Sequence, residues 1–273
     1  MSRVVLVTGS TDGIGRAAAR ALAAGGVKVI MHGRGKAKVD AAVAHLSSEL
    51  PGAEVEGVSF DLGSLKAVRN GAAQILERVP ELHCLINNAG IFASERAVND
   101  DGVELTFAVN HLGPFLLTQL LAPRLIDSAR AAKIPSRVIN VASIAHSRGR
   151  IHSDDLSLAT GWTGYAAYAQ SKLANVMHAI SLAERYPPSE LLAYSVHPGV
   201  IQTKLLRHGF GPIAGAPTDA GARTLVRLAG EEQPSEPSGT YFSDGVATQP
   251  ATVARDARAR AALWDASARL AQL

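Results

Sequence analysis

Short apolar runs alternate with alanine-rich segments along almost the whole chain, and this alternation is what most constrains the fold. The runs are rich in consecutive Val, Ile and Leu, and we predict strands at Val4–Thr8, Lys28–His32, Val55–Phe60, Cys84–Asn87, Arg137–Ala142, Leu192–His197 and Thr240–Phe242. Strands that are apolar on consecutive residues are typical of a parallel sheet covered on both faces. Helices are predicted between and after them at Ile14–Ala24, Lys36–Glu49, Ser64–Arg78, Val103–Ala131, Tyr165–Tyr186, Thr218–Ala229 and Val253–Leu270. The pattern predicts an α/β fold: a single domain over residues 1–273, built on a doubly wound parallel (Rossmann) sheet of about seven strands with helices on both faces.

Composition narrows the class of protein further. The 273 residues are 47% hydrophobic and 19% charged, which is typical of a folded globular domain. The net charge is only +3 and no dense basic run is present, so nucleic acid is not expected as a partner. The only cysteine, Cys84, excludes a disulfide within the chain and is expected to be a buried, inert thiol. No apolar stretch reaches the ~20 residues of a membrane span and no signal peptide is apparent, so we expect a cytoplasmic protein.

A glycine-rich turn follows the first predicted strand. It runs Thr8-Gly9-Ser10-Thr11-Asp12-Gly13-Ile14-Gly15 and leads directly into a helix. Glycine lets a backbone turn tightly against a pyrophosphate, and a helix amino terminus offers free N–H groups to the anion. A strand before the glycines and a helix after them favour a dinucleotide site over a turn with no ligand.

The spacing Gly-x-x-x-Gly-x-Gly, together with further motifs in order, resembles the short-chain dehydrogenase/reductase family. Asp61-Leu62 ends the third predicted strand, and Asn87-Asn88-Ala89-Gly90 ends the fourth. Later motifs are Val109-Asn110-His111-Leu112-Gly113, Val141-Ala142-Ser143, Tyr168-Ala169-Gln170-Ser171-Lys172 and Pro198-Gly199-Val200-Ile201-Gln202-Thr203. The resemblance covers nearly the whole chain.

The resemblance implies a cofactor-binding set and a catalytic set of residues. The cofactor-binding residues it implies are Gly9, Ser10, Thr11, Gly13, Ile14, Gly15, Arg34, Asp61, Leu62, Asn88, Ala89, Gly90, Tyr168, Lys172, Pro198, Gly199, Ile201 and Thr203. The catalytic residues it implies are Asn110, Ser143, Tyr168 and Lys172. In this scheme Asp61 contacts adenine, Thr203 holds the carboxamide, and Asn110 anchors a water that links Lys172 to solvent.

The second predicted strand ends in His32-Gly33-Arg34-Gly35-Lys36, with no acid before Asp40. In this fold an acid at that strand end bonds the ribose 2′-hydroxyl, whereas an arginine accommodates a 2′-phosphate. Arg34 can bond a phosphate through two N–H groups, and Lys36 and Lys38 add positive charge. Asp12 weighs against a phosphate because it adds negative charge near the turn. The sequence favours NADP(H) over NAD(H).

Tyr168 and Lys172 are four residues apart, so on a helix they share a face. A free tyrosine has a pKa of ~10, and a nearby cation favours its ionised form. We therefore predict that Lys172 and the oxidised nicotinamide lower the pKa of Tyr168 towards the working pH. The resemblance implies that Tyr168 exchanges a proton with the carbonyl or alcohol oxygen, that Ser143 polarises the same oxygen, and that Lys172 holds the nicotinamide ribose.

Two long irregular segments, near residues 144–164 and 199–217, are expected to flank the substrate. The first contains Ile151, Leu156, Leu158 and Trp162, and the second contains Leu205, Leu206, Phe210 and Ile213. These residues either line an apolar pocket or pack the segments onto the domain. The long first segment, the residues from Asn110 to Phe115 and Leu263-Trp264 together resemble the retinol-dehydrogenase-like branch of the family. We expect an apolar or aromatic carbonyl or alcohol as substrate.

Other functions remain open at this stage. The first alternative is an NAD-dependent alcohol dehydrogenase in which Arg34 is merely solvated, and the second is a non-catalytic dinucleotide sensor. His146, His152, Asp154 and Asp155 have no standard metal-site spacing, so no metal is expected. The family commonly pairs helices such as Tyr165–Tyr186 across subunits, so a homo-oligomer is possible.

Overall fold

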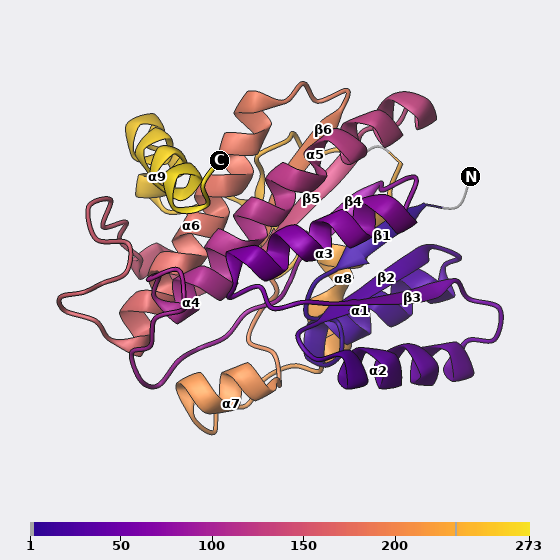
Figure 1. Cartoon of the computed structure of the whole chain (residues 1–273), viewed down its shortest axis with the longest axis horizontal. Coiled ribbons are helices and arrows are strands. Elements are labelled where there is room, and N and C mark those ends of the chain that lie inside the picture. Colours follow the sequence, from indigo (N-terminus) through magenta and orange to yellow (C-terminus); the bar gives the residue numbers. More distant parts are fainter. Residues whose placement is uncertain (1–2, 233) are drawn as a thin grey trace.

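The computed structural model describes residues 3–232 and 234–273 (Figure 1). Within those residues eight strands form one sheet in the order β3-β2-β1-β4-β5-β6-β7-β8. Their bounds are β1 Val4–Val7, β2 Lys28–Gly33, β3 Val55–Ser59, β4 Cys84–Asn87, β5 Ser136–Val141, β6 Leu191–His197, β7 Tyr241–Ser243 and β8 Val246–Thr248. All pairs are parallel except β7 with β8. The predicted doubly wound α/β fold is confirmed, and about seven strands is close to the eight observed.

The helices cover both faces of the sheet. The α-helices are α1 Gly13–Ala24, α2 Lys36–Glu49, α3 Leu65–Arg78, α4 Leu105–Phe107, α5 Gly113–Ala132, α6 Gly164–Arg185, α7 Lys204–Phe210, α8 Thr218–Gly230 and α9 Ala257–Leu270. A π-helix, η1 (Ala108–Leu112), joins α4 to α5, and the 3₁₀ helices are η2 (Ile144–Arg148) and η3 (Thr252–Arg255). One buried cluster packs α3, α5, α6 and α9 on the sheet, and a second packs α1, α2 and α8 on the other face.

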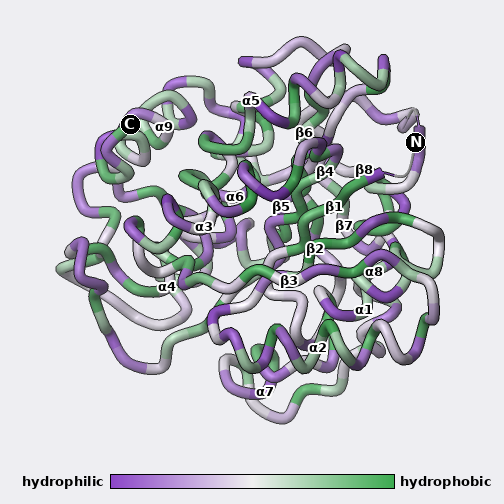
Figure 2. The backbone as a smooth tube through the Cα atoms, turned by 45° about the vertical axis from the view of Figure 1, so that its right-hand side comes forward, coloured by the Kyte–Doolittle hydropathy of each residue, from purple (hydrophilic) through white to green (hydrophobic). Residues whose placement is uncertain are grey.

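Burial explains why these segments form strands. Every residue of β1, β4, β5 and β6 is buried, so their consecutive apolar side chains fill both cores. Figure 2 shows the hydrophobic colours concentrated along these central strands. Cys84 is fully buried, and burial raises the pKa of its thiol to about 12, as expected for an inert cysteine.

Four elements differ from the sequence prediction. The helix predicted over Val253–Leu270 is divided into η3 and α9. β8 was not predicted, because Val246–Thr248 is short and exposed. α7 lies in a segment that we expected to be irregular, and its helical turns begin where the Thr203 side chain accepts a hydrogen bond from the Leu206 N–H at 3.1 Å. The helix predicted over Val103–Ala131 is divided by η1 into three parts.

The helical segment Leu105–Ala132 is long and apolar enough to cross a membrane by length and composition alone. Of its most apolar 18-residue window, 78% is buried inside the protein. The apolar character is explained by packing, because Phe107, Phe115 and Leu121 belong to the core between α3, α6 and the sheet.

α9 lies against α6, the helix that the resemblance suggested for pairing between subunits (Figure 1). Trp264 packs edge-on against Phe115 with ring centroids 5.0 Å apart, and the Arg185 guanidinium lies 3.8 Å from the Trp264 ring centroid. Ser267 bonds His111 at 3.0 Å. An interface between subunits built on α6 would therefore have to use the part of this helix that α9 leaves uncovered.

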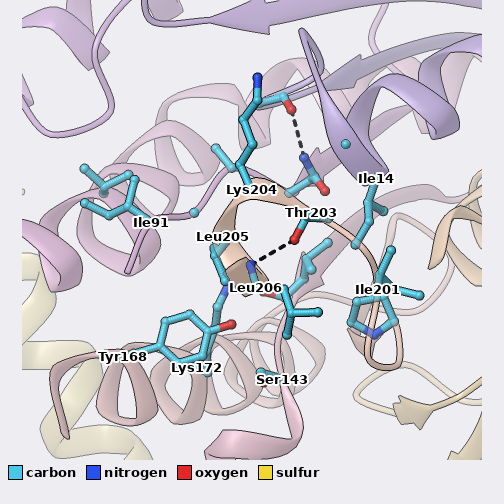
Figure 3. Close-up of a pocket in the computed structure, with 18 of the residues that line it drawn as sticks. Ile14, Ile91, Ser143, Tyr168, Lys172, Ile201, Thr203, Lys204, Leu205 and Leu206 are labelled. Atoms are coloured by element: carbon cyan, nitrogen blue, oxygen red, sulfur yellow. Dashed lines mark hydrogen bonds between the residues drawn. The ribbon is translucent and has the colours of Figure 1, made fainter. Parts of the chain in front are cut away.

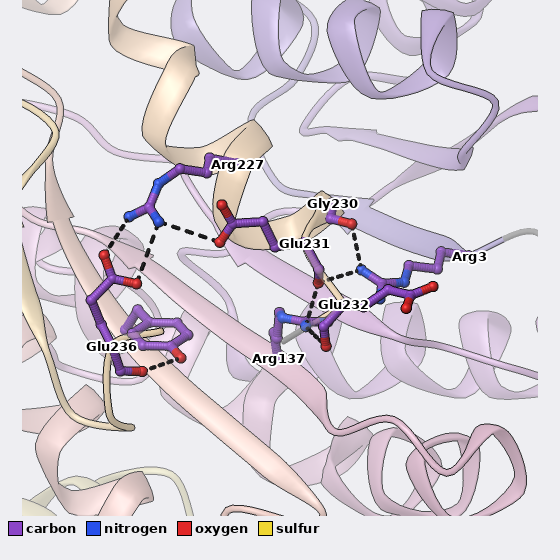
Figure 4. Close-up of polar contacts among 8 residues, drawn as sticks. Arg3, Arg137, Arg227, Gly230, Glu231, Glu232 and Glu236 are labelled. Carbon is purple, nitrogen blue, oxygen red and sulfur yellow. Dashed lines mark hydrogen bonds and ion pairs between the residues drawn. The ribbon is translucent and has the colours of Figure 1, made fainter. Parts of the chain in front are cut away.

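Two arginines cap the carboxyl end of α8 (Figure 4). They lie at the amino ends of the parallel strands, away from the carboxyl ends. Arg3 donates to the carbonyls of Ala229, Gly230 and Glu231 at 2.7–3.1 Å. Arg137 is fully buried and donates to the carbonyls of Glu231 and Glu232 at 2.5 and 2.9 Å. Cations stabilise a helix carboxyl terminus because its last carbonyls carry partial negative charge.

We expect Arg137→Leu to lower the free energy of unfolding by about 2 kcal/mol, because the Glu232 carbonyl loses its donor and the Glu231 carbonyl keeps only Arg3. Arg130→Ala is the control, since Arg130 is exposed and its pair with Glu190 should contribute less than about 1 kcal/mol. Urea unfolding followed by circular dichroism measures both. Equal, small losses would show that the buried arginine is not needed to hold α8.

Candidate active site

A cavity of about 860 Å³ opens along the carboxyl ends of the parallel strands. It is lined by residues that directly follow β1, β2, β3, β4, β5 and β6. The sheet order reverses between β1 and β4, and open α/β sheets bind ligands at this switch point. Of the predicted site residues, the cavity is lined by Gly9, Thr11, Gly13, Ile14, Arg34, Asp61, Leu62, Asn88, Ala89, Gly90, Ser143, Tyr168, Lys172, Pro198, Gly199, Ile201 and Thr203.

Three predicted residues lie behind the cavity wall instead. Ser10 is fully buried, and its hydroxyl donates to the Val7 carbonyl at 2.8 Å and accepts from the His32 N–H at 2.9 Å. Gly15 is buried at the start of α1. The Asn110 side chain is also fully buried. These residues hold the wall in place, and no contact with a ligand follows from their positions.

The glycine-rich turn is tied to the end of β4. The Thr8 hydroxyl accepts hydrogen bonds from the Asn88 and Ala89 N–H groups at 2.9 and 3.0 Å. The Asn88 side-chain amide donates to the carbonyls of Thr8 and Gly9 at 2.8 and 3.2 Å. Gly9 has a φ of +63°, and a Cβ there would lie 2.8 Å from the Ala89 Cα. Glycine is therefore required at position 9 by both conformation and close approach.

Tyr168 and Lys172 face the cavity from the same helix, and Ser143 reaches it from the end of β5 (Figure 3). The Lys172 ammonium lies 5.6 Å from the Tyr168 ring centroid. Burial raises the pKa of Tyr168 to about 12, although a hydrogen bond with Ser143 acts in the opposite direction. Burial lowers the pKa of Lys172 to about 8.

Lys172 alone therefore does not lower the pKa of Tyr168 below its ordinary value, and the effect of the oxidised nicotinamide stays a prediction. The reason is that the phenol is only 5% exposed, and its desolvation outweighs the opposing effect of Ser143. Tyr168 is fully protonated at neutral pH, and this is the state that donates a proton to a carbonyl oxygen. Lys172 loses its proton as the pH rises through about 8.

Lys172 and Asn110 converge on Gly90. The Lys172 ammonium donates to the Val141 carbonyl at 3.0 Å, which leaves further N–H groups free. The Asn110 side chain accepts from the Ile91 N–H at 2.7 Å and donates to the Ile91 carbonyl and the Ser171 hydroxyl, both at 3.0 Å. A Cβ at Gly90 would lie 3.3 Å from both Asn110 Oδ1 and Lys172 Nζ. Asn110 lies in the π-helix η1, a type of irregularity that is frequent at functional sites.

Arg34 and Asp61 lie at the other end of the cavity, after β2 and β3. Arg34 is exposed and makes no hydrogen bond or ion pair with any residue that the structure describes. Asp61 accepts a hydrogen bond from the Gly63 N–H through Oδ1 at 2.8 Å. By contrast, Lys36 is engaged with Asp40 at 2.6 Å.

Sequence reasoning missed several cavity residues. His32 accepts a hydrogen bond from the Gly9 N–H at 3.3 Å and bonds the Phe60 carbonyl at 3.1 Å, and burial lowers its pKa to about 4. Its position directly before Gly33-Arg34 at a strand end was the available signal. His197 is the second missed residue, and it ends β6. It lines the cavity, and its buried Nδ1 has no partner among the described residues.

Asp12 has a different role from the one that the sequence suggested. Its carboxylate accepts from the Gly13 N–H at 2.8 Å and pairs with Lys204 at 2.5 Å. The hydrogen bond with Lys204 is the main reason that the pKa of Asp12 is lowered. Because Lys204 compensates the charge of Asp12, this residue no longer weighs against a phosphate ligand. The ion pair also joins α7 to the glycine-rich turn across the cavity.

The two long segments behave differently. Leu205, Leu206, Phe210 and Ile213 line the cavity, as one of the two alternatives predicted. Four residues of the first segment do not line the cavity and instead pack their loop onto the domain: Ile151, Leu156, Leu158 and Trp162. Leu156 and Leu158 are buried, and Trp162 bonds Glu104 at 3.3 Å. The first segment contributes Ile144, Ala145, Ser147 and Arg148 to the cavity.

The cavity residues fit a nicotinamide dinucleotide. A Cβ at Gly15 would lie 2.4–2.5 Å from the Asn88 amide and the Gly9 carbonyl, so this turn can form only around a glycine. Arg34 and His197 Nδ1 are polar groups without a partner in the described chain, at opposite ends of the cavity. Residues 3–232 and 234–273 contain no group of three or more His, Cys, Asp or Glu side chains that could hold a metal ion.

The fold and the cavity define a dinucleotide-dependent oxidoreductase. The short chain dehydrogenase family model matches residues 3–210. Bovine retinol dehydrogenase 12 is 37% identical over 98% of this chain and 86% of its own. Among solved structures, an uncharacterized protein from Mycobacterium paratuberculosis has a TM-score of 0.80 at 33% identity, covering 99% of this chain and 93% of its own. A short chain dehydrogenase from Shigella flexneri, complexed with NADP, has a TM-score of 0.73 at 25% identity, covering 89% and 97%.

The chain belongs to the short-chain dehydrogenase/reductase family, in its retinol-dehydrogenase-like branch. It is an enzyme that transfers a hydride between a nicotinamide cofactor and a CH–OH or C=O group.

Proposed function

We propose that this enzyme uses NADP(H) and reduces apolar or aromatic carbonyl compounds, or oxidises the corresponding alcohols. The observation that carries the cofactor preference is Arg34, an unpaired guanidinium at the end of β2 that lines the cavity. A guanidinium binds a phosphate through two parallel hydrogen bonds, and no carboxylate at this strand end is placed to accept from a ribose 2′-hydroxyl. The NADP complex of the Shigella flexneri relative is consistent with this preference.

The side chains at the nicotinamide end account for the chemistry. The bound cofactor supplies or accepts the hydride. Tyr168 donates its proton to the carbonyl oxygen during reduction, and Ser143, which lines the cavity with Tyr168, stabilises the same oxygen. Lys172, held by the Val141 carbonyl, places a cation next to the phenol as negative charge develops there. Burial of Tyr168 and Lys172 strengthens these interactions because the local dielectric is low.

The substrate end favours apolar molecules. Leu205, Leu206 and Phe210 come from α7, and Ile91 faces them from the end of β4 (Figure 3). The Phe210 ring lies 5.7 Å from the Tyr168 ring, centroid to centroid, so an aromatic wall stands beside the proton donor. Pockets of this composition bind apolar ligands and use a few polar groups for orientation.

We expect Arg34→Ala to abolish the preference for NADPH. The wild type should bind NADPH about 10- to 100-fold more tightly than NADH, as one charge-assisted bidentate contact implies, and the variant should bind both within about 3-fold. NADH binding should not change. Fluorescence titration of each protein with both cofactors measures this effect. Lys36→Ala is the control, because Lys36 carries the same charge nearby but is paired with Asp40.

The second candidate is an NAD-dependent alcohol dehydrogenase in which Arg34 only contacts solvent. Exposure of Arg34 is the observation in its favour. It predicts equal binding of NADH and NADPH by the wild type and no effect of Arg34→Ala.

A further inference from the structure

Six residues with charged side chains line the cavity, and they are Asp12, Arg34, Asp61, Arg148, Lys172 and Lys204. Asp12 and Lys204 neutralise one another across the cavity. Arg34 and Asp61 lie at the adenosine end, and Lys172 faces the reacting groups. Arg148 is left over: it has no hydrogen bond or ion pair with any other described residue, and no step of the reaction uses it.

Arg148 lies on the substrate side of the cavity. It is the last residue of η2, the 3₁₀ helix whose first N–H groups are capped by Ser143. The phosphate-binding turn follows β1, and β1 lies two positions from β5 in the sheet, or about 10 Å at ~4.8 Å per strand. Arg148 is therefore on the Ser143 side, away from the cofactor phosphates.

The surroundings of Arg148 make its charge available to a ligand. Ile144 and Ala145 on the same helix line the cavity with it, and Ile213 and Leu206 are among the apolar residues on the α7 side. Arg148 is itself exposed, as is Ile144 beside it, so its guanidinium is open to a ligand that enters the cavity from solvent. A guanidinium matches the two oxygens of a carboxylate.

We propose that the substrate is amphipathic, with an apolar body that carries the reacting carbonyl and a carboxylate that Arg148 binds. The proposal rests on the proposed function, and it adds the second recognition group of the substrate. Arg148 follows Ser143 by five residues, which in a 3₁₀ helix is a rise of about 10 Å at ~2.0 Å per residue, so the backbone positions of the two residues are well separated along η2.

The test compares medium- and long-chain oxo-carboxylic acids with their methyl esters, at saturating NADPH. For the wild type we expect kcat/KM to be about 10- to 100-fold higher for the acid than for the ester, mainly through KM. Arg148→Ala should remove this difference and leave turnover of the ester unchanged. Arg150→Ala is the matched control, because Arg150 is exposed on the same loop but does not line the cavity, and it should keep the preference for the acid.

The outcomes separate this proposal from the function on which it rests. If the wild type turns over the ester as well as the acid, the carboxylate contact is wrong and the apolar carbonyl reductase stands. If Arg150→Ala loses the preference as Arg148→Ala does, the cause is the general positive charge of the loop, and the contact with Arg148 is wrong. If neither acid nor ester is reduced although NADPH binds, the proposed substrate class fails, and this proposal fails with it.

Discussion

Replacing Tyr168 with phenylalanine should lower kcat/KM for carbonyl reduction by about 10³-fold while NADPH still binds within about 3-fold of the wild type. The lost hydroxyl is the proton donor, and positioned general acids contribute 10²- to 10⁴-fold. The ring should stay in place, because it packs between Phe92 and Phe210 with centroids 5.5 and 5.7 Å away. NADPH consumption at 340 nm measures turnover, and fluorescence titration measures binding.

Tyr165→Phe is the matched control for this experiment. Tyr165 lines the same cavity one helical turn earlier, is 38% exposed and lies 6.4 Å from Phe210. It has no lysine four residues later, so we expect its turnover to remain within about 3-fold of the wild type. If Tyr168→Phe kept a tenth or more of the activity, the proton would have to come from another group, and the mechanism given above would be wrong.

Much of the fold could be predicted from the sequence, because local patterns determine it. The strands buried on both faces, β1 and β4 to β6, are apolar on consecutive residues and were predicted to within one residue at each end. The missed elements lack such a pattern. β8 is an edge strand that pairs only with β7. α7 begins at Thr203, whose side chain caps its first turn. The break between η3 and α9 depends on Asp256, whose side chain caps α9.

Some features of the candidate site also follow from local sequence patterns, whereas others depend on the packed structure. Motif residues at strand ends come together because parallel strands end at one edge of the sheet, so their positions followed from the topology. The ion pair of Asp12 with Lys204 joins residues 192 positions apart, and no local pattern encodes it. The pKa of Tyr168 also depends on burial, which is a property of the packed domain and is the largest cause of its shift. Arg148 appeared in the sequence only as one of many scattered basic residues.

Gly15→Ala should weaken NADPH binding by about 10²-fold and lower the unfolding free energy by about 2 kcal/mol. The added carbon would lie 2.4 Å from the Asn88 amide nitrogen and 2.5 Å from the Gly9 carbonyl oxygen, inside van der Waals contact with both. The amide could rotate, but the Gly9 carbonyl is backbone, so α1 must move away from the turn. Overpacking of this kind costs about 1–3 kcal/mol, and the shift also misplaces the N–H groups that face the cofactor phosphates.

Gly35→Ala provides the control for this strain. Gly35 lies beside Arg34 at the same cavity, but its φ is −106° and no atom lies within 4 Å of the carbon that would be added. We expect its stability and NADPH affinity to match the wild type. Thermal unfolding with and without NADPH separates the loss of stability from the loss of NADPH binding in Gly15→Ala. If the variant is folded but NADPH no longer raises its unfolding temperature, only the shape of the phosphate-binding turn has been lost. If Gly15→Ala gained as much thermal stability from NADPH as the wild type, the close packing of the turn on Asn88 would not be what shapes the phosphate site.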